Sequence, residues 1–479
     1  MKYVITGATG LIGRALMLRL LKDGHQVTAI TRSVARATRQ LGADITVVAW
    51  SDSLGIQRAL EHSDGVIHLA GEPIADRRWT QRQKRTLWDS RVKLTQTLVK
   101  HMQRCTVPPK VLISASAVGF YGQRSKPVDE SSAAGKGFTS RLAVAWEAAA
   151  QDATDLGVRV VQLRLGLVLA RSGAFRIMDA AYRRGLGARV GSGTHGACWI
   201  HLADVLGLIE WALHRQDIHG PLNATAPNSR TQQEVHADFS THYGRQWSPA
   251  IPGFLVRLAL GERARLLTHG AVVDAHVALS QGYSFLFPTL TAALTHLTNR
   301  KRYQDIQFET CLNVQKAGGQ DATYVLMSST RVGAPLSQVA PWFETPHNLT
   351  LMTPPFMRFK ILQAENMAEN AMLSYQIDLF GFPMKWTSKI PVFEPGVRFV
   401  DTQVRGPYRL WWHEHRYQSD GEETWVYDTV HYTLPLGVLG RIAHALWVKP
   451  TLRRIFEYRT DTMHERFGHA APTPKRISA

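Results

Sequence analysis

The sequence predicts an α/β fold built on a doubly wound parallel sheet, followed by a second domain of the α+β class. Residues 3–5 form an apolar run that stops at Thr6-Gly7, and apolar residues then recur with helical spacing from Leu11 to Leu21. A second apolar run, residues 27–30, follows at the distance typical of a strand–helix–strand unit. The second domain is predicted by several strand-like segments and a final helix.

Three glycines lie in the turn between the first strand and the first helix, at positions 7, 10 and 13. Glycine lets the chain bend tightly, lets a pyrophosphate approach the backbone and lets the helix pack close to the strand. Free amides at the helix start then face the phosphates. We predict a dinucleotide site here; the alternative is a plain strand–turn–helix whose glycines serve geometry alone. The predicted cofactor-binding residues are Gly7, Thr9, Gly10, Leu11, Ile12, Gly13, Arg32, Ser33, Leu69, Ala70, Gly71 and Ser114.

The end of the second strand indicates which dinucleotide is bound. It reads Thr31-Arg32-Ser33, where an NAD-specific site would usually carry an acid for the ribose hydroxyls. An arginine suits a 2′-phosphate instead. We therefore predict NADP as the cofactor, with NAD less favoured.

Composition and length limit the class of protein and the number of domains. A chain of 479 residues with 44% hydrophobic and 20% charged residues is typical of a globular protein of two to four domains. No segment approaches the run of roughly 18 apolar residues that a membrane span needs, so we expect no membrane insertion. The first residues lead directly into a predicted strand, so we expect them to belong to the fold rather than to a leader. Cys105, Cys198 and Cys311 lack metal-ligand spacing, which predicts free thiols in a reducing cytoplasm.

The net charge of +18 comes mostly from the first 300 residues, which hold 36 Lys and Arg against 21 Asp and Glu. The densest basic cluster lies on a predicted helix that begins near Arg77 and whose other face is apolar. A solvated amphipathic face explains this better than nucleic-acid binding, which we do not expect. Attraction of an anionic cofactor is the simpler use of the charge. The cluster comprises Arg77, Arg78, Arg82, Lys84, Arg85, Arg91 and Lys93.

Further strands complete the predicted parallel sheet, at residues 45–49, 65–71, 111–114 and 158–165. The fourth strand ends in small residues, which leave room for a cofactor in the crevice of such a sheet; an ordinary buried strand is the alternative. The fifth strand brings Ser114 and Ser116 to the carboxyl edge, where ligands of this architecture bind.

The order of several blocks resembles the extended short-chain dehydrogenase/reductase superfamily, and more narrowly an epimerase-like family that ends in a small helical segment, here residues 249–297. The resemblance implies a Rossmann domain with NADP in the glycine turn and a small substrate lobe that includes His201 and Asp204. A structural His201, with Asp204 as helix cap, is the alternative. The blocks are TGATGLIG, VIHLAGEPI, LISASAVGFYG, LRLGLVLARSGA, GSGTHGACWIHLADV and GPLNATAPN.

The catalytic residues of the superfamily are only partly present. Ser116, or alternatively Ser114, matches the serine that orients the substrate oxygen. A Tyr-x-x-x-Lys pair should precede Trp146, but residues 137–144 contain neither tyrosine nor lysine. The nearby Tyr121 is therefore the predicted proton donor, with Lys136 as another candidate. Ser116 and Tyr121 are the predicted catalytic residues.

The region after residue 322 resembles the START-like or polyketide-cyclase-like (SRPBCC) superfamily, a helix-grip fold. It shows strand-like runs, a short helix at residues 335–343 and one long final helix from Leu436 to about Phe467, kinked at Pro450. The resemblance implies an apolar cavity for a hydrophobic small molecule, although each aromatic residue also suits an ordinary core. Candidate lining residues are Phe356, Phe359, Phe380, Phe382, Trp386, Trp411, Trp412, Trp425 and Tyr427.

No metal site is expected. The sequence His413-Glu414-His415 is suggestive, but neighbours in a strand point to opposite faces and no third ligand is evident.

These observations predict five segments: an NADP-binding domain (1–245), a small helical segment (246–300), a linker or edge segment (301–322), a START-like ligand-binding domain (323–468) and a disordered tail (469–479). The predicted function is an NAD(P)-dependent oxidoreductase or epimerase that acts on or carries an apolar ligand, with a homodimer left open. One alternative is a non-catalytic NADP-binding sensor that regulates a partner. Another is a lipid carrier whose Rossmann domain no longer binds a cofactor.

Overall fold

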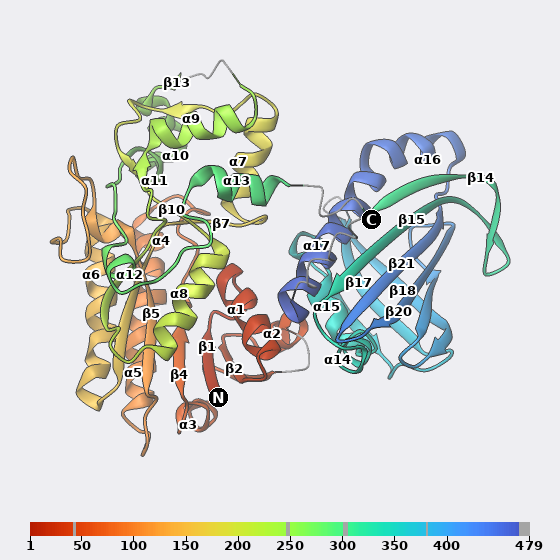
Figure 1. The fold of residues 1–479 in the computed structure, drawn as a ribbon, viewed down its shortest axis with the longest axis horizontal. Coiled ribbons are helices and arrows are strands. Elements are labelled where there is room, and N and C mark those ends of the chain that lie inside the picture. Colours follow the sequence, from red (N-terminus) through yellow and green to blue (C-terminus); the bar gives the residue numbers. More distant parts are fainter. Residues whose placement is uncertain (42–44, 246–249, 300–304, 380–381, 469–479) are drawn as a thin grey trace, which may run out of the picture. The chain divides into compact units, whose positions relative to one another are not determined.

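The computed structural model describes residues 1–41, 45–245, 250–299, 305–379 and 382–468. The predicted tail at 469–479 lies outside the described residues. Contacts divide the chain into two compact units, one built from most of the first 299 residues and one that contains the described residues after 304 (Figure 1).

The first unit is organised around a seven-stranded parallel sheet in the order β11-β6-β5-β4-β1-β2-β3. The central strands β1 (Lys2–Thr6) and β4 (Gly65–His68) are almost fully buried. Chain order reverses between these two strands, and a doubly wound sheet binds its ligands at such a reversal. The other strands are β2 (Gln26–Thr31), β3 (Thr46–Ala49), β5 (Val111–Ala117), β6 (Arg159–Leu165) and β11 (Gly220–Ala224).

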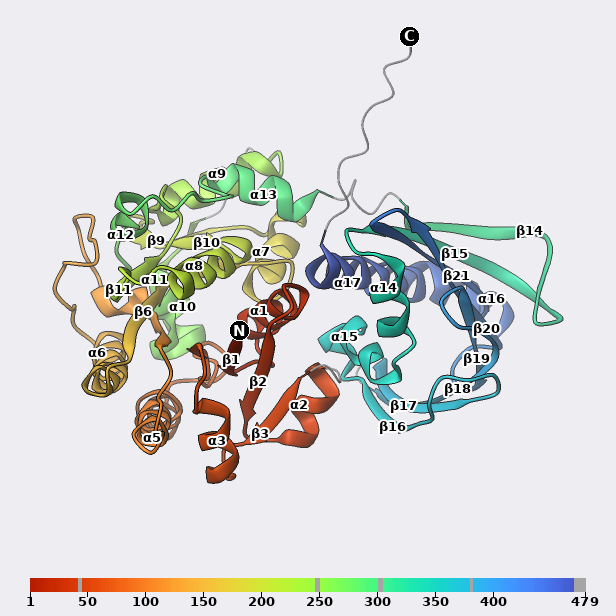
Figure 2. The same ribbon diagram turned by 60° about the horizontal axis from the view of Figure 1, so that its bottom comes forward.

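Helices cover both faces of this sheet, as the predicted alternation of strands and helices requires. Residues of α3 (Ser53–Leu60), α5 (Leu94–Met102) and α6 (Phe138–Gln151) pack on one face in a common core with the strands. Helices α1 (Leu11–Lys22) and α8 (Leu202–His214) lie on the other face (Figure 2). Helix α2 spans Val34–Leu41. The parallel sheet predicted from the sequence is therefore confirmed.

The predicted basic helix differs from expectation in two ways. It begins at α4 (Gln81–Trp88) rather than at residue 77, and a π-helical segment (Asp89–Lys93) separates α4 from α5. Arg91 lies in this segment and is half-buried, whereas the amphipathic interpretation placed it on the solvated face. Its guanidinium lies 5.2 Å from the Trp146 ring and donates from Nη2 to Glu72 O at 2.9 Å.

A small lobe extends the first unit beyond β6. Its core joins Phe175 of α7 (Ala174–Arg183), Trp199 of β10 (Trp199–His201), Phe239 of α9 (Gln232–His242) and Leu294 of α13 (Leu290–Thr298). Its other helices are α10 (Gly253–Leu260), α11 (Arg265–Thr268) and α12 (His276–Ser280), and its short strands are β7 (Leu167–Leu169), β8 (Arg189–Val190), β9 (Gly196–Ala197), β12 (Arg230–Thr231) and β13 (Ala250–Ile251).

The second unit contains an eight-stranded antiparallel sheet in the order β14-β15-β21-β20-β19-β18-β17-β16. Residues predicted as a linker or edge include the edge strand β14 (Gln307–Ala317). Helices α14 (Leu336–Phe343) and α15 (Leu349–Met352) follow β15 in the chain and precede β16. The other strands are β15 (Gln320–Val332), β16 (Lys360–Ala364), β17 (Met372–Leu379), β18 (Phe382–Glu394), β19 (Arg398–Arg405), β20 (Leu410–Asp420) and β21 (Glu423–Thr433).

The predicted C-terminal helix is present, since the chain is helical from Gly437 to Phe467, but it is not regular throughout. It consists of α16 (Gly437–Ala443), a π-helical segment (His444–Val448) and α17 (Lys449–Phe467). Pro450 is the second residue of α17 and directly follows the π-helical segment, so the regular helix is interrupted at the place where the sequence predicted a kink. The predicted apolar side holds only in α17, since Phe456 is buried and Ile442 is 51% exposed.

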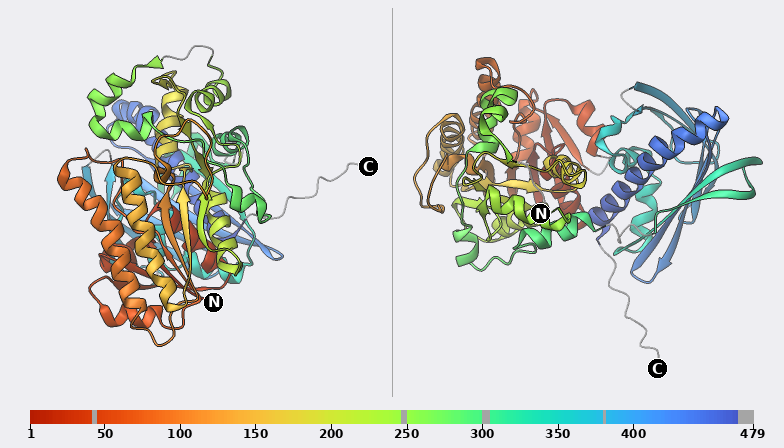
Figure 3. Two further views of the ribbon diagram at one scale, coloured as in Figure 1. Left: turned by 90° about the vertical axis from the view of Figure 1, so that its left-hand side faces the viewer. Right: turned by 90° about the horizontal axis from the view of Figure 1, so that it is seen from above.

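Helix α17 lies against one face of this sheet (Figure 3). Arg459 of α17 reaches Asp428 of β21, and Phe456 shares a core with Tyr432, so the side chains of Asp428 and Tyr432 mark the inner face. Trp425 and Tyr427 alternate with these positions and stack on each other on the outer face, which corrects their predicted place in a cavity. The side chains of Phe380 and Phe382 lie outside the described residues.

Two further predictions can be compared with the described part of the chain. Cys105 and Cys198 are free thiols, and burial raises the pKa of each to about 11. The Cys311 side chain is not described. No helix among the described residues combines the length and the apolar character needed to cross a membrane.

Candidate functional site

The glycine turn joins β1 to α1 and carries three glycines with different roles. Gly7 adopts φ +74°, and a Cβ there would lie 2.8 Å from the backbone of Leu69 and Ala70. A Cβ on Gly13 would lie 2.4 Å from Gly7 O. These two glycines are thus required by the protein's own packing. Gly10 is exposed, and its Cβ would approach only Gly7 O, at 3.2 Å, so it leaves the turn open to a ligand.

The start of α1 offers backbone donors at this turn. The N–H of Arg14 donates to Gly10 O at 3.0 Å, so the amides of Leu11, Ile12 and Gly13 precede this bond. The first turn of α1 contains no acidic side chain that would offset the positive end of the helix dipole. Thr9, Gly10 and Leu11 are exposed. This helix start therefore has the donors, the field and the access that a phosphate group needs.

The other predicted cofactor residues follow neighbouring strands of the same sheet. Arg32 and Ser33 are exposed directly after β2. Leu69, Ala70 and Gly71 follow β4. Because these strands are parallel and adjacent to β1, their carboxyl ends meet at the same edge of the sheet. Ser114 belongs to β5 but is 1% exposed, so it lies beneath this edge and not on it.

A buried histidine, which the sequence analysis did not single out, links the end of β1 to α5 beneath the glycine turn. His68 Nδ1 lies 2.6 Å from Thr6 Oγ1, and its Nε2 lies 3.0 Å from Thr95 Oγ1. Burial lowers the pKa of His68 to about 4, so its ring is neutral at neutral pH. Thr6 Oγ1 also accepts the Ala70 N–H at 3.3 Å. The available signal was a histidine within an otherwise apolar strand.

The predicted catalytic Ser116 belongs to a buried ion-pair network. Its hydroxyl donates to Glu147 Oε1 at 2.5 Å, and Arg164 donates to both oxygens of the same carboxylate at 2.9 and 2.8 Å. Ser116 is 2% exposed. Glu147 and Arg164 were not predicted as site residues. The signal was an arginine in a strand otherwise predicted to be buried, since a buried charge needs a partner.

Tyr121, the predicted proton donor, is engaged on both sides. Its hydroxyl donates to Asn223 Oδ1 at 2.7 Å and accepts from Arg164 Nη1 at 2.8 Å. The residue is fully buried, and burial raises the pKa of Tyr121 despite the nearby arginine. This placement gives no support to a role in proton transfer, and the assignment stays a prediction.

His201 and Asp204 both have structural roles, but the helix cap is His201 and not Asp204, which the sequence had suggested. His201 is the N-cap residue of α8, since its Nδ1 accepts the Ala203 N–H at 3.0 Å. Asp204 is not the cap. Its buried carboxylate accepts the N–H groups of Leu286 and Phe287, at 2.6 and 3.0 Å, and so holds the chain that leads into α13.

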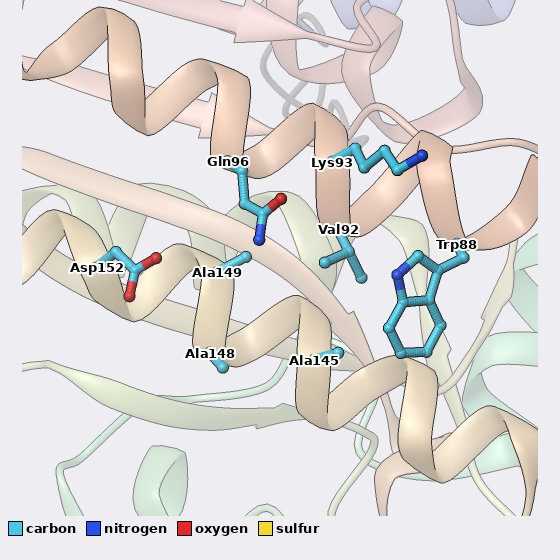
Figure 4. Close-up of a pocket in the computed structure, with 8 residues that line it drawn as sticks. All are labelled: Trp88, Val92, Lys93, Gln96, Ala145, Ala148, Ala149 and Asp152. Carbon is cyan, nitrogen blue, oxygen red and sulfur yellow. The ribbon is translucent and has the colours of Figure 1, made fainter.

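A pocket of about 420 Å³ lies away from these residues, between the α4–α5 region and α6 (Figure 4). Trp88 and Val92 face Ala145 and Ala149 across it. None of the predicted cofactor or catalytic residues lines this pocket, so it is separate from the glycine turn.

The second unit brings together side chains that the sequence analysis set aside. His413 and His415 are two residues apart on β20 and both are buried on the inner face; only Glu414, between them, points outward. Asp401 of β19 and Asp428 of β21 lie beside both imidazoles. The expectation that no third ligand is available is therefore wrong, because it treated the motif without its neighbouring strands.

Comparison with known proteins identifies the first unit. Residues 3–223 match the model of the NAD dependent epimerase/dehydratase family, and residues 251–297 match a domain of unknown function, DUF1731. The chain is 33% identical over 301 residues to the epimerase family protein YfhF of Bacillus subtilis, and these residues cover 62% of this chain and 98% of that protein. The corresponding values for the human epimerase family protein SDR39U1 are 34%, 303 residues, 62% and 99%.

Solved structures agree. The crystal structure of human SDR39U1 (isoform 2) with NADPH matches with a TM-score of 0.56 and 34% identity, over 62% of this chain and 99% of that one. A nucleoside-diphosphate sugar epimerase from Corynebacterium glutamicum matches with a TM-score of 0.50 and 27% identity, over 62% of this chain and 57% of that one. The parallel sheet, the glycine turn and these matches together show that the chain belongs to the NAD dependent epimerase/dehydratase family.

Proposed function

We propose that the first unit binds NADPH in the glycine turn and performs hydride-transfer chemistry on a carbonyl or alcohol. The observation that carries the proposal is the exposed start of α1, whose amides face an edge of the sheet that also presents Arg32. Phosphates of the dinucleotide accept hydrogen bonds from Leu11 and Ile12, and Arg32 pairs with the 2′-phosphate. The human relative crystallised with NADPH supports this choice of cofactor.

The bound nicotinamide supplies the hydride chemistry, and the protein supplies orientation and charge. In this proposal Ser116 turns its hydroxyl hydrogen from Glu147 towards the substrate oxygen and polarises it. Arg164 holds both oxygens of Glu147 in place through two hydrogen bonds, so the serine hydroxyl keeps an acceptor to which it can return. In this proposal Tyr121 stabilises the network through Arg164 and Asn223, and the proton that the reduced carbonyl oxygen takes up comes from solvent water.

Titration of the full-length protein with NADPH and NADH, followed by nicotinamide fluorescence, tests cofactor binding. We expect NADPH to bind more tightly than NADH. Arg32→Glu should reverse this preference, whereas Lys100→Glu, an equal charge change on the exposed side of α5, should not. Gly10→Ala should leave the fold intact and weaken both cofactors at least tenfold, because its methyl group enters the phosphate site. If the wild type, Arg32→Glu and Gly10→Ala all bind NADPH with equal affinity, the proposed site is ruled out.

A non-catalytic sensor is the second candidate function. The bonds of the Tyr121 hydroxyl and the absence of the Tyr-x-x-x-Lys pair favour it, because the usual proton donor is missing. In this case NADPH binds in the glycine turn and more tightly than NADH, yet no carbonyl substrate oxidises it. A library of aldehydes and ketones with the full-length protein separates the two: turnover that Ser116→Ala abolishes supports the enzyme, and binding without turnover supports the sensor.

The second unit is proposed to be a START-like module for a hydrophobic small molecule. An antiparallel sheet with two short helices after its second strand and a final helix against one face supports this assignment. The inner face carries clustered aromatic rings, with Trp386 and Trp411 5.2 Å apart. Tethering such a module to the first unit would raise the local concentration of its ligand near the proposed enzyme.

A further inference from the structure

The inner face of the antiparallel sheet carries two aspartates and two histidines in adjacent positions. Asp401 of β19 pairs in register with His413 of β20, and His415 of β20 pairs with Asp428 of β21. Asp428 and both histidines are at most 4% exposed, and the Asp401 side chain is 17% exposed. Each imidazole directs one nitrogen to each carboxylate.

The two carboxylates contact the rings in the same pattern but at different distances. Asp401 Oδ2 lies 3.2 Å from His413 Nδ1 and 3.2 Å from His415 Nε2. Asp428 Oδ1 lies 3.0 Å from His413 Nε2 and 2.9 Å from His415 Nδ1. The Asp428 contacts are thus of ordinary hydrogen-bond length, and the Asp401 contacts are at its upper limit.

Only two of these four contacts have hydrogen-bond geometry, His413 Nε2 to Asp428 and His415 Nε2 to Asp401, and two neutral imidazoles supply the two N–H groups that they need. In the other two contacts an unprotonated ring nitrogen would then face a carboxylate oxygen, at 3.2 Å between His413 Nδ1 and Asp401 and at 2.9 Å between His415 Nδ1 and Asp428. Two imidazolium rings would place an N–H group in all four contacts, but the ring centroids are 3.8 Å apart, so two positive charges would face each other inside the protein. A cation that takes the place of the two missing hydrogens removes this conflict.

We propose that Asp401, His413 and His415 bind a divalent first-row transition metal ion. The ligand atoms are Asp401 Oδ2, His413 Nδ1 and His415 Nε2. In a tetrahedral site with bonds of about 2.0–2.1 Å, ligand atoms lie about 3.3 Å apart, close to the separations from Asp401. Both rings are then neutral, and each donates its remaining N–H to Asp428.

Asp428 and Arg459 complete the site as supporting residues. Metal-bound histidines usually donate their free N–H to a carboxylate, which fixes the tautomer and the ring orientation. Asp428 does this for both rings at once, and Arg459 Nη2 balances its charge at 3.0 Å. On the opposite side, Ser388 Oγ lies 3.4 Å from Asp401 Oδ1 and so leaves Oδ2 to the metal.

The ligand set restricts the kind of metal. Two imidazoles and one carboxylate favour zinc, iron or cobalt over magnesium or calcium, which prefer oxygen ligands. Three protein ligands leave at least one coordination position for water or for a ligand atom, as in sites that take part in binding or chemistry. Aromatic rings surround the site, and those of Trp411 and Phe456 lie 6.0 and 5.8 Å from His413.

Metal titration of the full-length protein tests the proposal. Protein freed of metal with a chelator is titrated with Co²⁺, whose visible absorption reports its coordination, and Zn²⁺ is then added as competitor. We expect saturable Co²⁺ binding with a tetrahedral-type spectrum, and displacement by Zn²⁺. Asp401→Asn and His413→Gln should each weaken binding at least 100-fold, and Asp428→Asn should weaken it about 10–100-fold.

His431→Gln is the matched control, because His431 lies on β21 but alternates with the inner-face residues Val430 and Tyr432. It should bind Co²⁺ as the wild type does. Circular dichroism and thermal unfolding of each stripped variant establish that it is folded, and Zn²⁺ should raise the unfolding temperature of the wild type but not that of Asp401→Asn. Folded wild type that takes up no Co²⁺, or Asp401→Asn and His413→Gln variants that retain it, would overturn the proposal.

Discussion

Ser116 donates its hydroxyl hydrogen to Glu147 at 2.5 Å while Arg164 grips both oxygens of that carboxylate. The side chains of Glu147 and Arg164 are 11% and 4% exposed, so the pair is buried. A serine near the carboxyl end of β5 is thereby tied to an ion pair that joins α6 to β6. The network offers a way to separate a structural role from a catalytic one.

Glu147→Gln should be strongly destabilising and Ser116→Ala only mildly so. The first change leaves Arg164 as a buried charge without its counterion, which costs about 3–5 kcal/mol. The second removes one hydrogen bond to a carboxylate that keeps its arginine, which costs about 1–3 kcal/mol. Urea unfolding of the full-length variants measures both. Equal losses would show that the ion pair contributes little to stability.

Tyr121→Phe should lower stability by about 1–3 kcal/mol and leave NADPH affinity unchanged. The variant keeps the ring against Arg164 but leaves Asn223 Oδ1 without its donor. Thermal unfolding and a fluorescence titration check the two expectations. If turnover is found for the wild type, Tyr121→Phe should retain it, and complete loss of turnover with normal stability would restore the tyrosine as proton donor.

Gly7→Ala should destabilise the protein much more than Gly24→Ala. Both glycines have left-handed φ angles, +74° and +75°, so each alanine meets the same conformational strain of about 1–2 kcal/mol. Only at Gly7 does the added Cβ collide with backbone, whereas at Gly24 nothing lies within 4 Å. The difference between the unfolding free energies of the two variants measures the destabilisation caused by the contact of the added Cβ with the backbone after β4. Equal unfolding free energies would show that this contact costs nothing.

Stability should fall below pH 6.5 because of His68. Burial lowers the pKa of its ring from 6.5 to about 4, so the unfolded chain binds a proton more readily in between. The contribution is complete above pH 6.5 and declines as the pH drops towards 4. Between pH 7 and pH 5 it amounts to about 2 kcal/mol.

His68→Gln, which can still bond both threonines, should lose this part of the pH dependence. His219→Gln, at an exposed position, should keep it. Urea unfolding at the two pH values makes the comparison. Identical pH dependence in all three proteins would mean that the His68 ring is protonated or exposed in solution.

Trp411→Leu should weaken binding of a hydrophobic ligand by the second unit, and Trp425→Leu should not. Trp411 lies in the aromatic cluster of the inner face, whereas Trp425 stacks on Tyr427 on the outer face. Titration with a fluorescent fatty acid compares the variants, and we expect at least a tenfold loss for the first. Equal affinities would place the ligand elsewhere or argue against a carrier role.

Six strands of the parallel sheet could be predicted from the sequence because each contains a short apolar run. The seventh strand, β11, reads GPLNA and was not predicted, because it has no such run. The partly buried environment of Arg91 could not be predicted from the sequence. A prediction based on helical periodicity assumes 3.6 residues per turn, and the π-helical segment at residues 89–93 breaks that period, so Arg91 turns inward instead of facing solvent.

In the second unit, strand alternation predicts which residues share a face but not which face is covered. Trp425 and Trp411 therefore seemed equivalent in the sequence. The acids beside His413 and His415 come from neighbouring strands, and only the register of β19 to β21 brings them there. Side-chain clusters of this kind depend on long-range pairing, which a single sequence does not encode in any local pattern.

The charge of Arg91 affects the rate at which an anionic ligand associates with the protein. Its guanidinium lies behind Gly71 at the carboxyl end of β4, and although burial lowers the pKa of Arg91 to about 10, it stays charged at neutral pH. Together with Arg32, it gives this rim of the sheet a permanent positive potential. Anionic molecules should therefore be steered there by diffusion, with an association rate constant that falls as ionic strength rises.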